Sequence, residues 1–273
     1  AEDYALGKSE QNIGLLLSSF KNKDFYISSK ARLDPTSSES IFSQLDRKID
    51  KSLERLDRSH IDLYQLHNKI VKFGTKNSFS PKEIIKRKGV LDCLEKLKSE
   101  GRIKNIGITA LGDNEAIQEV ISTNGFDTAQ VYFNLLNPSA GFDKINDWND
   151  HDFSGIINEC IKNDMGIMCI RIFAAGILAT DLRHGREISV TQGIDENEQK
   201  RRIDKVLDLV RNEQGTRAQI ALRYGCSNVN LSCVVVGISN IEHLDEIIES
   251  IELGVLSEEI IKKIELLQRS NFN

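Results

Sequence analysis

Short apolar runs recur along the chain, and each follows a segment patterned like a helix. The clearest run, Ile61–His67, reads Ile-Asp-Leu-Tyr-Gln-Leu-His. Such a run after an amphipathic segment is typical of a buried strand in a parallel sheet. Ligands of these sheets bind beyond the carboxyl ends of the strands. His67 stands at such an end, where it is either a ligand-facing group or a hydrogen-bonded core histidine.

Other strand-like runs also carry polar side chains at or near their ends. Residues 25–30 end in the lone Lys30, and residues 104–109 end in the hydroxyl of Thr109. The run 128–134 carries Gln130 among apolar and aromatic residues. Because the carboxyl ends of parallel strands meet at one edge, the sequence predicts that these side chains face one cavity.

Helical patterns separate the strands, and this alternation decides the predicted fold class. Two further strands are expected over 165–173 and 232–236. No G-x-G-x-x-G motif follows a strand, so a Rossmann fold would lack its phosphate-binding turn. Helices between all the strands favour an α/β barrel. The predicted helices cover about 10–20, 42–56, 90–99, 113–123, 154–163, 199–212, 216–225, 242 onward and 257–269.

A barrel of this kind needs eight strands, whereas the sequence shows about six βα units. We therefore predict that residues 1–273 form a single barrel domain truncated at its N-terminus, with two units expected before Ala1.

Three stretches lack a clear period: 68–88, 135–153 and 180–200. Long irregular segments in compact domains are usually binding loops or lids. The only tryptophan, Trp148, lies in the second stretch and is expected either to anchor it or to act in a lid. Residues 35–39 hold a T-x-x-E pattern, which predicts a capping box for the next helix.

The overall composition excludes several classes of function. The chain is 40% hydrophobic and 28% charged, with a net charge of −5 and no basic stripe, which argues against nucleic-acid binding. No apolar run is long enough to cross a bilayer, and no signal peptide is seen. We expect a cytoplasmic protein whose cysteines are buried thiols, because none has C-x-x-C spacing: Cys93, Cys160, Cys169, Cys226 and Cys233.

Five motifs then stand in a fixed order along the chain. They are Tyr4-x-x-Gly-x-Ser-Glu10, Ser52-Leu-x-Arg55, Asp62-Leu-Tyr-x-Leu-His67, a Gly89-to-Gly107 segment, and Gln130-x-x-x-Asn134. In order and spacing they resemble the aldo-keto reductases over nearly the whole chain. The resemblance implies a (β/α)8 TIM barrel that transfers hydride between a nicotinamide cofactor, NADP or NAD, and a carbonyl, with no metal.

The stretch Arg171–Leu178 further resembles a branch that contains sugar 1-dehydrogenases. An arginine inside so apolar a run must be paired or face a polar cavity. The branch implies an aldehyde, a ketone or a sugar lactol as substrate.

The resemblance implies roles for three catalytic residues. Tyr4 matches the tyrosine that protonates the developing alkoxide. Lys30 matches the lysine that eases proton loss from the phenol. His67 matches the histidine that binds the carbonyl oxygen. The family's catalytic aspartate would fall before Ala1. Asp3 is not its equivalent and is interpreted as a solvated loop carboxylate.

The cofactor residues implied by the resemblance come from four segments. Thr109 and Gln130 match carboxamide-binding positions, and the segment 171–176 matches the lining of the nicotinamide and pyrophosphate. The segment 237–246 matches the adenosine-phosphate loop, where a helix N-terminus would bind the anion. The full set is Thr109, Gln130, Arg171, Phe173, Ala174, Gly176, Gly237, Ser239, Asn240, His243 and Glu246.

The same segment bears on the choice of cofactor. Residues 237–250 contain no lysine or arginine, but they contain Glu242, Asp245, Glu246 and Glu249. A ribose 2′-phosphate would meet mostly negative charge there, apart from His243. We therefore predict weak discrimination between the cofactors or a lean toward NAD(H).

Two other functions remain open at this point. One is a catalytically silent, nucleotide-binding or regulatory subunit on the same fold, which would resemble the potassium-channel β subunits. The other is a (β/α)8 aldolase in which Lys30 forms a Schiff base.

Overall fold

The computed structural model describes residues 4–20, 25–182 and 195–273. It contains two compact units, which we describe separately. Unit 1 comprises Ala1–Ala129 and Asn163–Met165, and unit 2 comprises Gln130–Lys162 and Gly166–Asn273.

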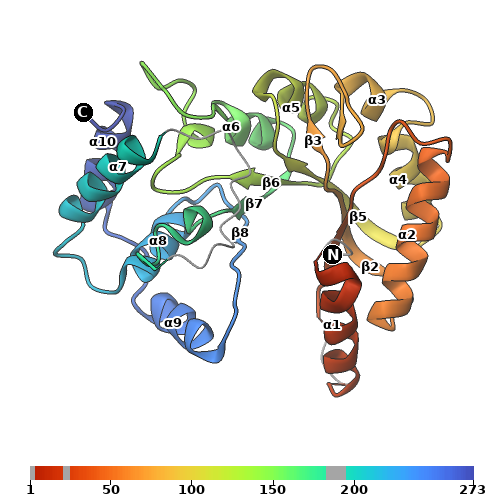
Figure 1. Cartoon of the computed structure of the whole chain (residues 1–273), viewed down its shortest axis with the longest axis horizontal. Coiled ribbons are helices and arrows are strands. Elements are labelled where there is room, and N and C mark those ends of the chain that lie inside the picture. Colours follow the sequence, from red (N-terminus) through yellow and green to blue (C-terminus); the bar gives the residue numbers. More distant parts are fainter. Residues whose placement is uncertain (1–3, 21–24, 183–194) are drawn as a thin grey trace. The chain divides into compact units, whose positions relative to one another are not determined.

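Unit 1 alternates strands with helices, as the apolar periodicity predicts. Its elements in chain order are η1 (Ala5–Gly7), α1 (Lys8–Ser18), β1 (Ser28–Ala31), α2 (Ile41–Leu56), β2 (Ile61–Leu66), β3 (Lys69–Ile70), β4 (Ser78–Phe79), α3 (Pro81–Ile85), α4 (Val90–Ser99), β5 (Ile103–Ala110), α5 (Asn114–Ile121) and the start of β6 (Thr128–Tyr132). Figure 1 shows these elements in red to green.

The strands β1, β2 and β5 pair in parallel. Lys30 in β1 lies opposite Gln65 in β2, and Leu66 lies opposite Ile108 in β5. The backbone N–H of His67 continues the ladder by donating to the carbonyl of Ala31 at 2.8 Å. This register brings the carboxyl ends of three strands to one edge of the sheet.

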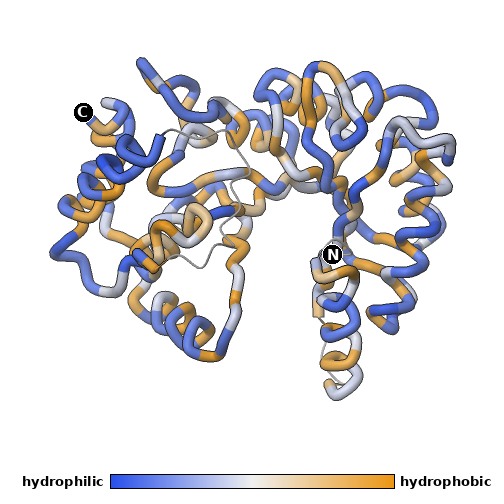
Figure 2. Tube along the Cα trace, viewed as in Figure 1, coloured by the Kyte–Doolittle hydropathy of each residue, from blue (hydrophilic) through white to orange (hydrophobic). Residues whose placement is uncertain are grey.

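Local sequence explains where α2 begins and ends. The hydroxyl of Ser40 accepts a hydrogen bond from the N–H of Ser43, and Asp57 ends the helix at a φ of 52°. The T-x-x-E pattern is therefore not the cap, because Thr36 bonds to Asp34 instead. The apolar stripe of α2 is buried, whereas polar residues face outward, as the colouring of Figure 2 illustrates.

The segment 68–88 is more ordered than its sequence predicts. It contains the two-residue strands β3 and β4, which pair in parallel, and the short helix α3. Ser80 and Glu83 form the capping box of α3. The buried side chain of Asn68 bonds to the backbone of Leu33, which ties this segment to the end of β1. Two-residue strands show no period, so the sequence could not reveal them.

Unit 2 continues the alternation with the end of β6. Its further elements are η2 (Ser139–Gly141), α6 (Ile156–Lys162), β7 (Gly166–Ile170), η3 (Ala174–Gly176), α7 (Glu196–Leu209), α8 (Arg217–Cys226), β8 (Cys233–Val234), α9 (Ile241–Glu252) and α10 (Glu258–Arg269). β7 and β8 pair in parallel, with Met168 opposite Cys233.

Among the described residues, the main sheet has six strands in the order β1-β2-β5-β6-β7-β8. β6 belongs to both units, because the boundary falls after Ala129. The predicted α/β class and the parallel sheet are confirmed. β8 is shorter than the predicted strand over 232–236.

The cysteines depart in part from the prediction that all five are buried. Cys93, Cys160 and Cys169 are buried, but Cys226 and Cys233 are exposed. Cys226 ends α8 and Cys233 starts the short strand β8, so their immediate surroundings include solvent. The apolar pattern of the sequence did not distinguish these positions from core positions.

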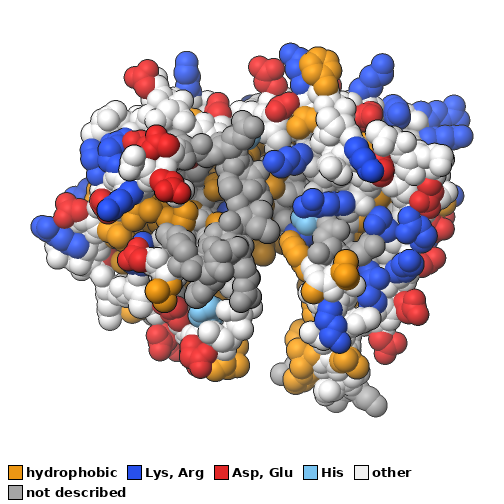
Figure 3. Space-filling model, in the orientation of Figure 1, with side chains coloured by type: hydrophobic (Ala, Val, Ile, Leu, Met, Phe, Trp, Pro, Cys, Tyr) orange, Lys and Arg blue, Asp and Glu red, His pale blue; other side chains and the backbone are white. Residues whose placement is uncertain are grey.

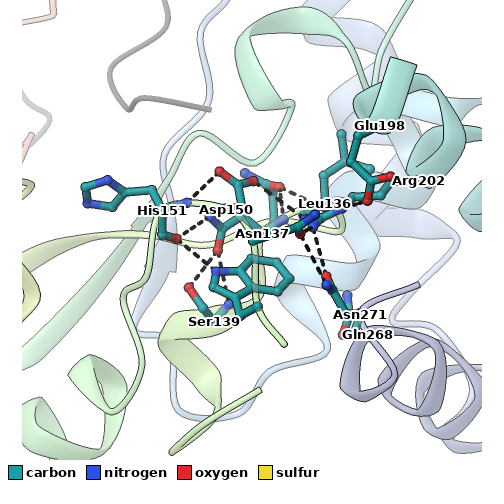
Figure 4. Close-up of polar contacts among 12 residues, drawn as sticks. Leu136, Asn137, Ser139, Asp150, His151, Glu198, Arg202, Gln268 and Asn271 are labelled. Atoms are coloured by element: carbon teal, nitrogen blue, oxygen red, sulfur yellow. Dashed lines mark hydrogen bonds and ion pairs between the residues drawn. The ribbon is translucent and has the colours of Figure 1, made fainter. Parts of the chain in front are cut away.

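The segment 135–153 is held in place by a buried arginine of α7, as Figure 4 shows. Arg202 has no exposed surface. It donates to Glu198 at 3.0 Å, to the carbonyl of Leu136 at 3.2 Å and to the side-chain oxygen of Asn271 at 2.9 Å. Its guanidinium lies 4.5 Å from the ring of Trp148. Trp148 is therefore an anchor for this segment.

The surface in Figure 3 mixes both signs of charge with scattered apolar side chains. Leu15 and Leu16 of α1 are among the exposed large apolar residues. In the described part of the chain, no helix is long and apolar enough to cross a membrane.

Candidate active site

Unit 1 brings three predicted catalytic side chains together. The Nζ of Lys30 donates a hydrogen bond to the phenol oxygen of Tyr4 at 3.1 Å and lies 5.2 Å from the centre of its ring. The rings of Tyr4 and His67 meet edge to face with their centroids 6.0 Å apart. Tyr4 is 49% exposed.

Each of these residues is placed by a different element. Lys30 lies in β1, and His67 directly follows β2. Tyr4 precedes η1, whose last residue, Gly7, has a φ of 87° and opens α1. That left-handed conformation favours glycine and turns the chain from Tyr4 into the helix.

Unit 1 also contains a buried hydroxyl that lacks a partner. Thr109 is 2% exposed at the end of β5, and its Oγ1 has no hydrogen-bond partner among the described residues. A buried hydroxyl without a partner is unfavourable, which suits a site that a polar ligand group completes. The contact of Thr109 with a carboxamide stays a prediction.

Unit 2 contains a cavity of about 1080 Å³. This volume is at the upper end of the range for small-molecule and cofactor sites. The loop after β7 and the segment from β8 into α9 form much of its wall. The predicted cofactor residues that line it are Arg171, Phe173, Gly176, Gly237, Ser239, Asn240, His243 and Glu246.

The α9 end of the cavity offers backbone and side-chain hydrogen-bonding groups. The side chain of Asn240 caps α9 by accepting from the N–H of His243 at 2.9 Å. The Oγ of Ser239 and the Nδ1 of His243 are 3.1 Å apart. A Cβ at Gly237 would meet no atom within 4 Å, so the backbone there is open to close approach. A helix start with accessible backbone suits a phosphate.

The loop after β7, which contributes Arg171, Ala175 and Gly176 to the cavity lining, has an unusual backbone. Arg171, Ala174 and Ala175 have positive φ values of 64°, 46° and 59°. Non-glycine residues in this region are strained, and such strain concentrates at ligand-binding sites. Gly176 follows with a φ of 95° and open space where a Cβ would lie.

Three predicted cofactor positions do not line this cavity. Ala174 is buried at 7% exposure and does not line the cavity, and Gln130 is buried in β6 at 4% exposure, also away from its lining. Thr109 belongs to unit 1. Asp3 lies outside the described residues.

The cavity also has lining residues that the sequence analysis did not single out. Gln219 could have been noticed, because Thr216 and Gln219 form a capping box at the start of α8. The others lack a local signal: Ile172, Ala175, Ala179, Thr180, Leu182, Ala218, Leu222, Val235, Ile238, Ile247 and Ser250.

Glu246 links the two helices beside the cavity. Its carboxylate accepts a hydrogen bond from the hydroxyl of Thr216, and its backbone carbonyl accepts one from Gln219 at 3.3 Å. On the same helix, Glu249 accepts a hydrogen bond from Gln219 at 3.1 Å. Acidic side chains thus lie at the α9 side of the cavity.

Comparison with known proteins identifies the family. Residues 1–269 match the Aldo/keto reductase family. The chain belongs to the aldo/keto reductase family. The prediction of an NAD(P)-dependent oxidoreductase is thereby confirmed at the level of the family.

Solved aldo-keto reductases share the fold. The holo form of the Bacillus halodurans enzyme is 19% identical with a TM-score of 0.73, and the match covers 97% of this chain and 80% of that one. The Klebsiella pneumoniae enzyme in complex with NADP and acetate is 20% identical with a TM-score of 0.65, covering 97% and 77%. A thermostable aldo-keto reductase with the inhibitor epalrestat is 22% identical with a TM-score of 0.67, covering 97% and 80%.

Proposed function

We propose that this aldo/keto reductase reduces an aldehyde, a ketone or a sugar lactol in its carbonyl form with a nicotinamide cofactor. The observation that carries the proposal is the Tyr4–Lys30 hydrogen bond of 3.1 Å with the His67 ring beside Tyr4. A phenol, an ammonium and an imidazole so arranged can bind a carbonyl oxygen and protonate it.

In the proposed reaction, Tyr4 donates its proton to the substrate oxygen as negative charge develops there. The positive charge of Lys30 stabilises the phenolate that remains. The imidazole of His67 donates a hydrogen bond to the same oxygen and orients the substrate. When bound, a nicotinamide cofactor would supply the hydride.

The cavity of unit 2 fits the phosphates and the adenosine of such a cofactor. Backbone N–H groups at the start of α9 suit the anion, and Ser239 and Asn240 offer further polar contacts. Arg171, also in the lining, offers positive charge.

Replacing the phenol tests the catalytic assignment. We expect Tyr4→Phe to lower turnover at least about a hundredfold, because it removes the general acid. The dissociation constant for the cofactor, measured by calorimetry, should stay within about threefold of that of the parent. A carbonyl panel that includes an aromatic aldehyde and an aldose provides the substrates. Unchanged turnover in this variant would refute the role of Tyr4.

We further propose that this chain discriminates weakly between the cofactors or favours NAD(H). No lysine or arginine occurs in 237–250, and Glu246 lines the cavity. A charge-assisted contact to a 2′-phosphate contributes roughly 1.5–3 kcal/mol where one is present.

Calorimetric titration with NADH and with NADPH, each at low and high salt, tests this proposal. Similar constants, or tighter binding of NADH, agree with it. Binding of NADPH that is tenfold tighter or more would contradict it. As a matched variant, Glu246→Gln should improve binding of NADPH more than binding of NADH, because it removes negative charge without changing the shape of the side chain.

A further inference from the structure

A buried ion pair joins α1 to α2 and also contacts β1, the strand that carries Lys30. Glu10, in the first turn of α1, has 1% of its side chain exposed, and Arg55, at the end of α2, has 15%. Arg55 donates from Nε and NH2 to the same carboxylate oxygen, at 2.7 and 2.6 Å. The sequence motifs contain both residues, but the proposed reaction uses neither.

The second oxygen of Glu10 reaches the strand that carries the lysine. Oε1 accepts a hydrogen bond of 2.5 Å from the hydroxyl of Ser29, which is 1% exposed. Ser29 directly precedes Lys30 in β1. Both oxygens of one buried carboxylate are thus engaged, one with β1 and one with α2.

Arg55 reaches toward the segment that carries the tyrosine. The backbone of Gly7 packs closely against the Arg55 side chain. A Cβ at Gly7 would be only 2.8 Å from Cδ and Nε of Arg55. Only two residues separate Gly7 from Tyr4. The middle of α1 also packs closely against α2, since a Cβ at Gly14 would be 2.4 Å from the carbonyl oxygen of Arg55.

We propose that Glu10 and Arg55 are positioning residues that act as one unit to hold the Tyr4 hydroxyl and the Lys30 ammonium in contact. The proposal rests on the proposed function for its kinetic consequence. Neither side chain touches the substrate. The pair acts through Ser29 on the lysine strand and through Gly7 on the tyrosine segment.

A buried ion pair could also serve only stability, so the test needs a control of the same kind. Asp62 is a buried carboxylate with 4% of its side chain exposed, and it accepts a hydrogen bond from Lys104 at 3.0 Å. It lies near the start of β2, whereas His67 follows the end of that strand. The other carboxylate oxygen of Asp62 accepts a hydrogen bond from the N–H of Ile27 at 2.9 Å, directly before β1. Asp62→Asn therefore removes a comparable buried charge that also contacts the β1 segment, but at the opposite end of the strands from Lys30 and His67.

The variants are Glu10→Gln, Arg55→Met, the double variant, Ser29→Ala and the control Asp62→Asn. Turnover of nitrobenzaldehyde with NADH is measured well below each thermal midpoint. We expect Glu10→Gln to lower kcat about tenfold to hundredfold, with KM and the cofactor dissociation constant within about threefold. Ser29→Ala keeps the ion pair, so we expect it to fold more readily than Glu10→Gln. It should also give a smaller fall in kcat than Glu10→Gln.

The double variant separates one unit from two independent residues. If Glu10 and Arg55 act together, it loses about as much kcat as the more damaged single variant. If the fold-losses in kcat of the two single variants multiply in the double variant, Glu10 and Arg55 do not act as one unit. A kcat for Glu10→Gln within threefold of that of the parent would overturn the positioning role. An equal fall in the kcat of Asp62→Asn would also overturn the positioning role, because the loss of any buried charge would then lower kcat.

Crystal structures of the parent and of Glu10→Gln provide a readout that does not depend on activity. We expect the distance from the Tyr4 oxygen to the Lys30 nitrogen to lengthen beyond hydrogen-bond range in the variant. A retained distance overturns the inference. If the parent turns over no carbonyl, the proposed function fails, while this distance still decides the positioning role.

Discussion

At the scale of single residues, burial separates groups that can react from groups that cannot. Tyr4 is half exposed, whereas the thiols of Cys160 and Cys169 are buried completely. Burial raises the pKa of each of these two thiols to about 12. The thiolate is the reactive form, so both cysteines are inert near neutral pH.

We predict that two of the five cysteines react in the native protein. At about pH 8, a chromogenic aryl disulfide reagent should modify Cys226 and Cys233, which are exposed, before the buried three. All five should react after unfolding in urea. The double variant Cys226→Ser/Cys233→Ser serves as the control, and rapid reaction that persists in it would contradict the prediction.

The same contrast explains what sequence could reveal about single residues. Lys30 and His67 could be predicted because each ends or follows a short apolar run. The partners of Glu10 could not be predicted from local pattern, because Arg55 is 45 residues away in sequence. Arg202 is another such case, because its contacts with Leu136 and Asn271 span 66 and 69 residues.

At the scale of elements, α7 is fixed by one side chain that the hydrophobic pattern does not identify. The helix presents Arg202 to the segment 135–153 and to the C-terminal residues, where Phe272 lies 4.8 Å from its guanidinium. Asp150 lies 3.6 Å from Arg202, yet burial raises the pKa of that carboxyl despite the opposite charge. Desolvation outweighs attraction at this position.

We predict that Arg202→Met destabilises the fold by about 3–5 kcal/mol, because removing one partner leaves buried polar groups uncompensated. Urea unfolding measures the loss. The control is Arg211→Met, just beyond α7, whose guanidinium pairs with Asp208 while both side chains are largely exposed. Its effect should be much smaller. Equal losses of unfolding free energy in the two variants would show that the burial of Arg202 adds no stability beyond that of an exposed ion pair.

Element boundaries were predicted best where the amphipathic pattern is long. The helix over 90–99 was predicted with the bounds that the structure shows for α4. The bounds of α2 were predicted within one residue, but its cap was misjudged, because a T-x-x-E pattern precedes the serine that caps the helix. β3 and β4 were missed, because pairs of two residues have no measurable period.

At the scale of the whole molecule, the α/β class followed from six apolar runs separated by helical patterns. The parallel pairing followed from the helices between the strands. The cavity of unit 2 could be predicted only in part, because its wall combines residues of η3, α8 and α9 that no local motif relates.

We predict that the carboxylate of Glu198 makes the free energy of unfolding of the whole chain depend on pH in the acid range. Hydrogen bonds from Arg201, and then from Arg202, lower the pKa of Glu198 from 4.5 to about 2. A lowered folded-state pKa contributes stability above about pH 4.5, and this contribution disappears as the pH falls toward 2. The difference in unfolding free energy between the parent and Glu198→Gln should therefore be largest above pH 5.

Urea unfolding of both proteins at a series of pH values measures this difference. Glu259→Gln is the control, because its partner Lys263 is on the surface and contributes little. A difference between the parent and Glu198→Gln that stays constant down to about pH 2 would contradict the prediction.

The position of Trp148 gives the protein a built-in optical reporter. It is the only indole in the chain, and it lies against the guanidinium of Arg202 while its Nε1 donates to the carbonyl of His151 at 3.2 Å. Light that excites indole but not phenol therefore reports on a single location, in unit 2. Its emission therefore reports whether the segment 135–153 is packed against α7. The emission contains no contribution from the tyrosines, including Tyr4.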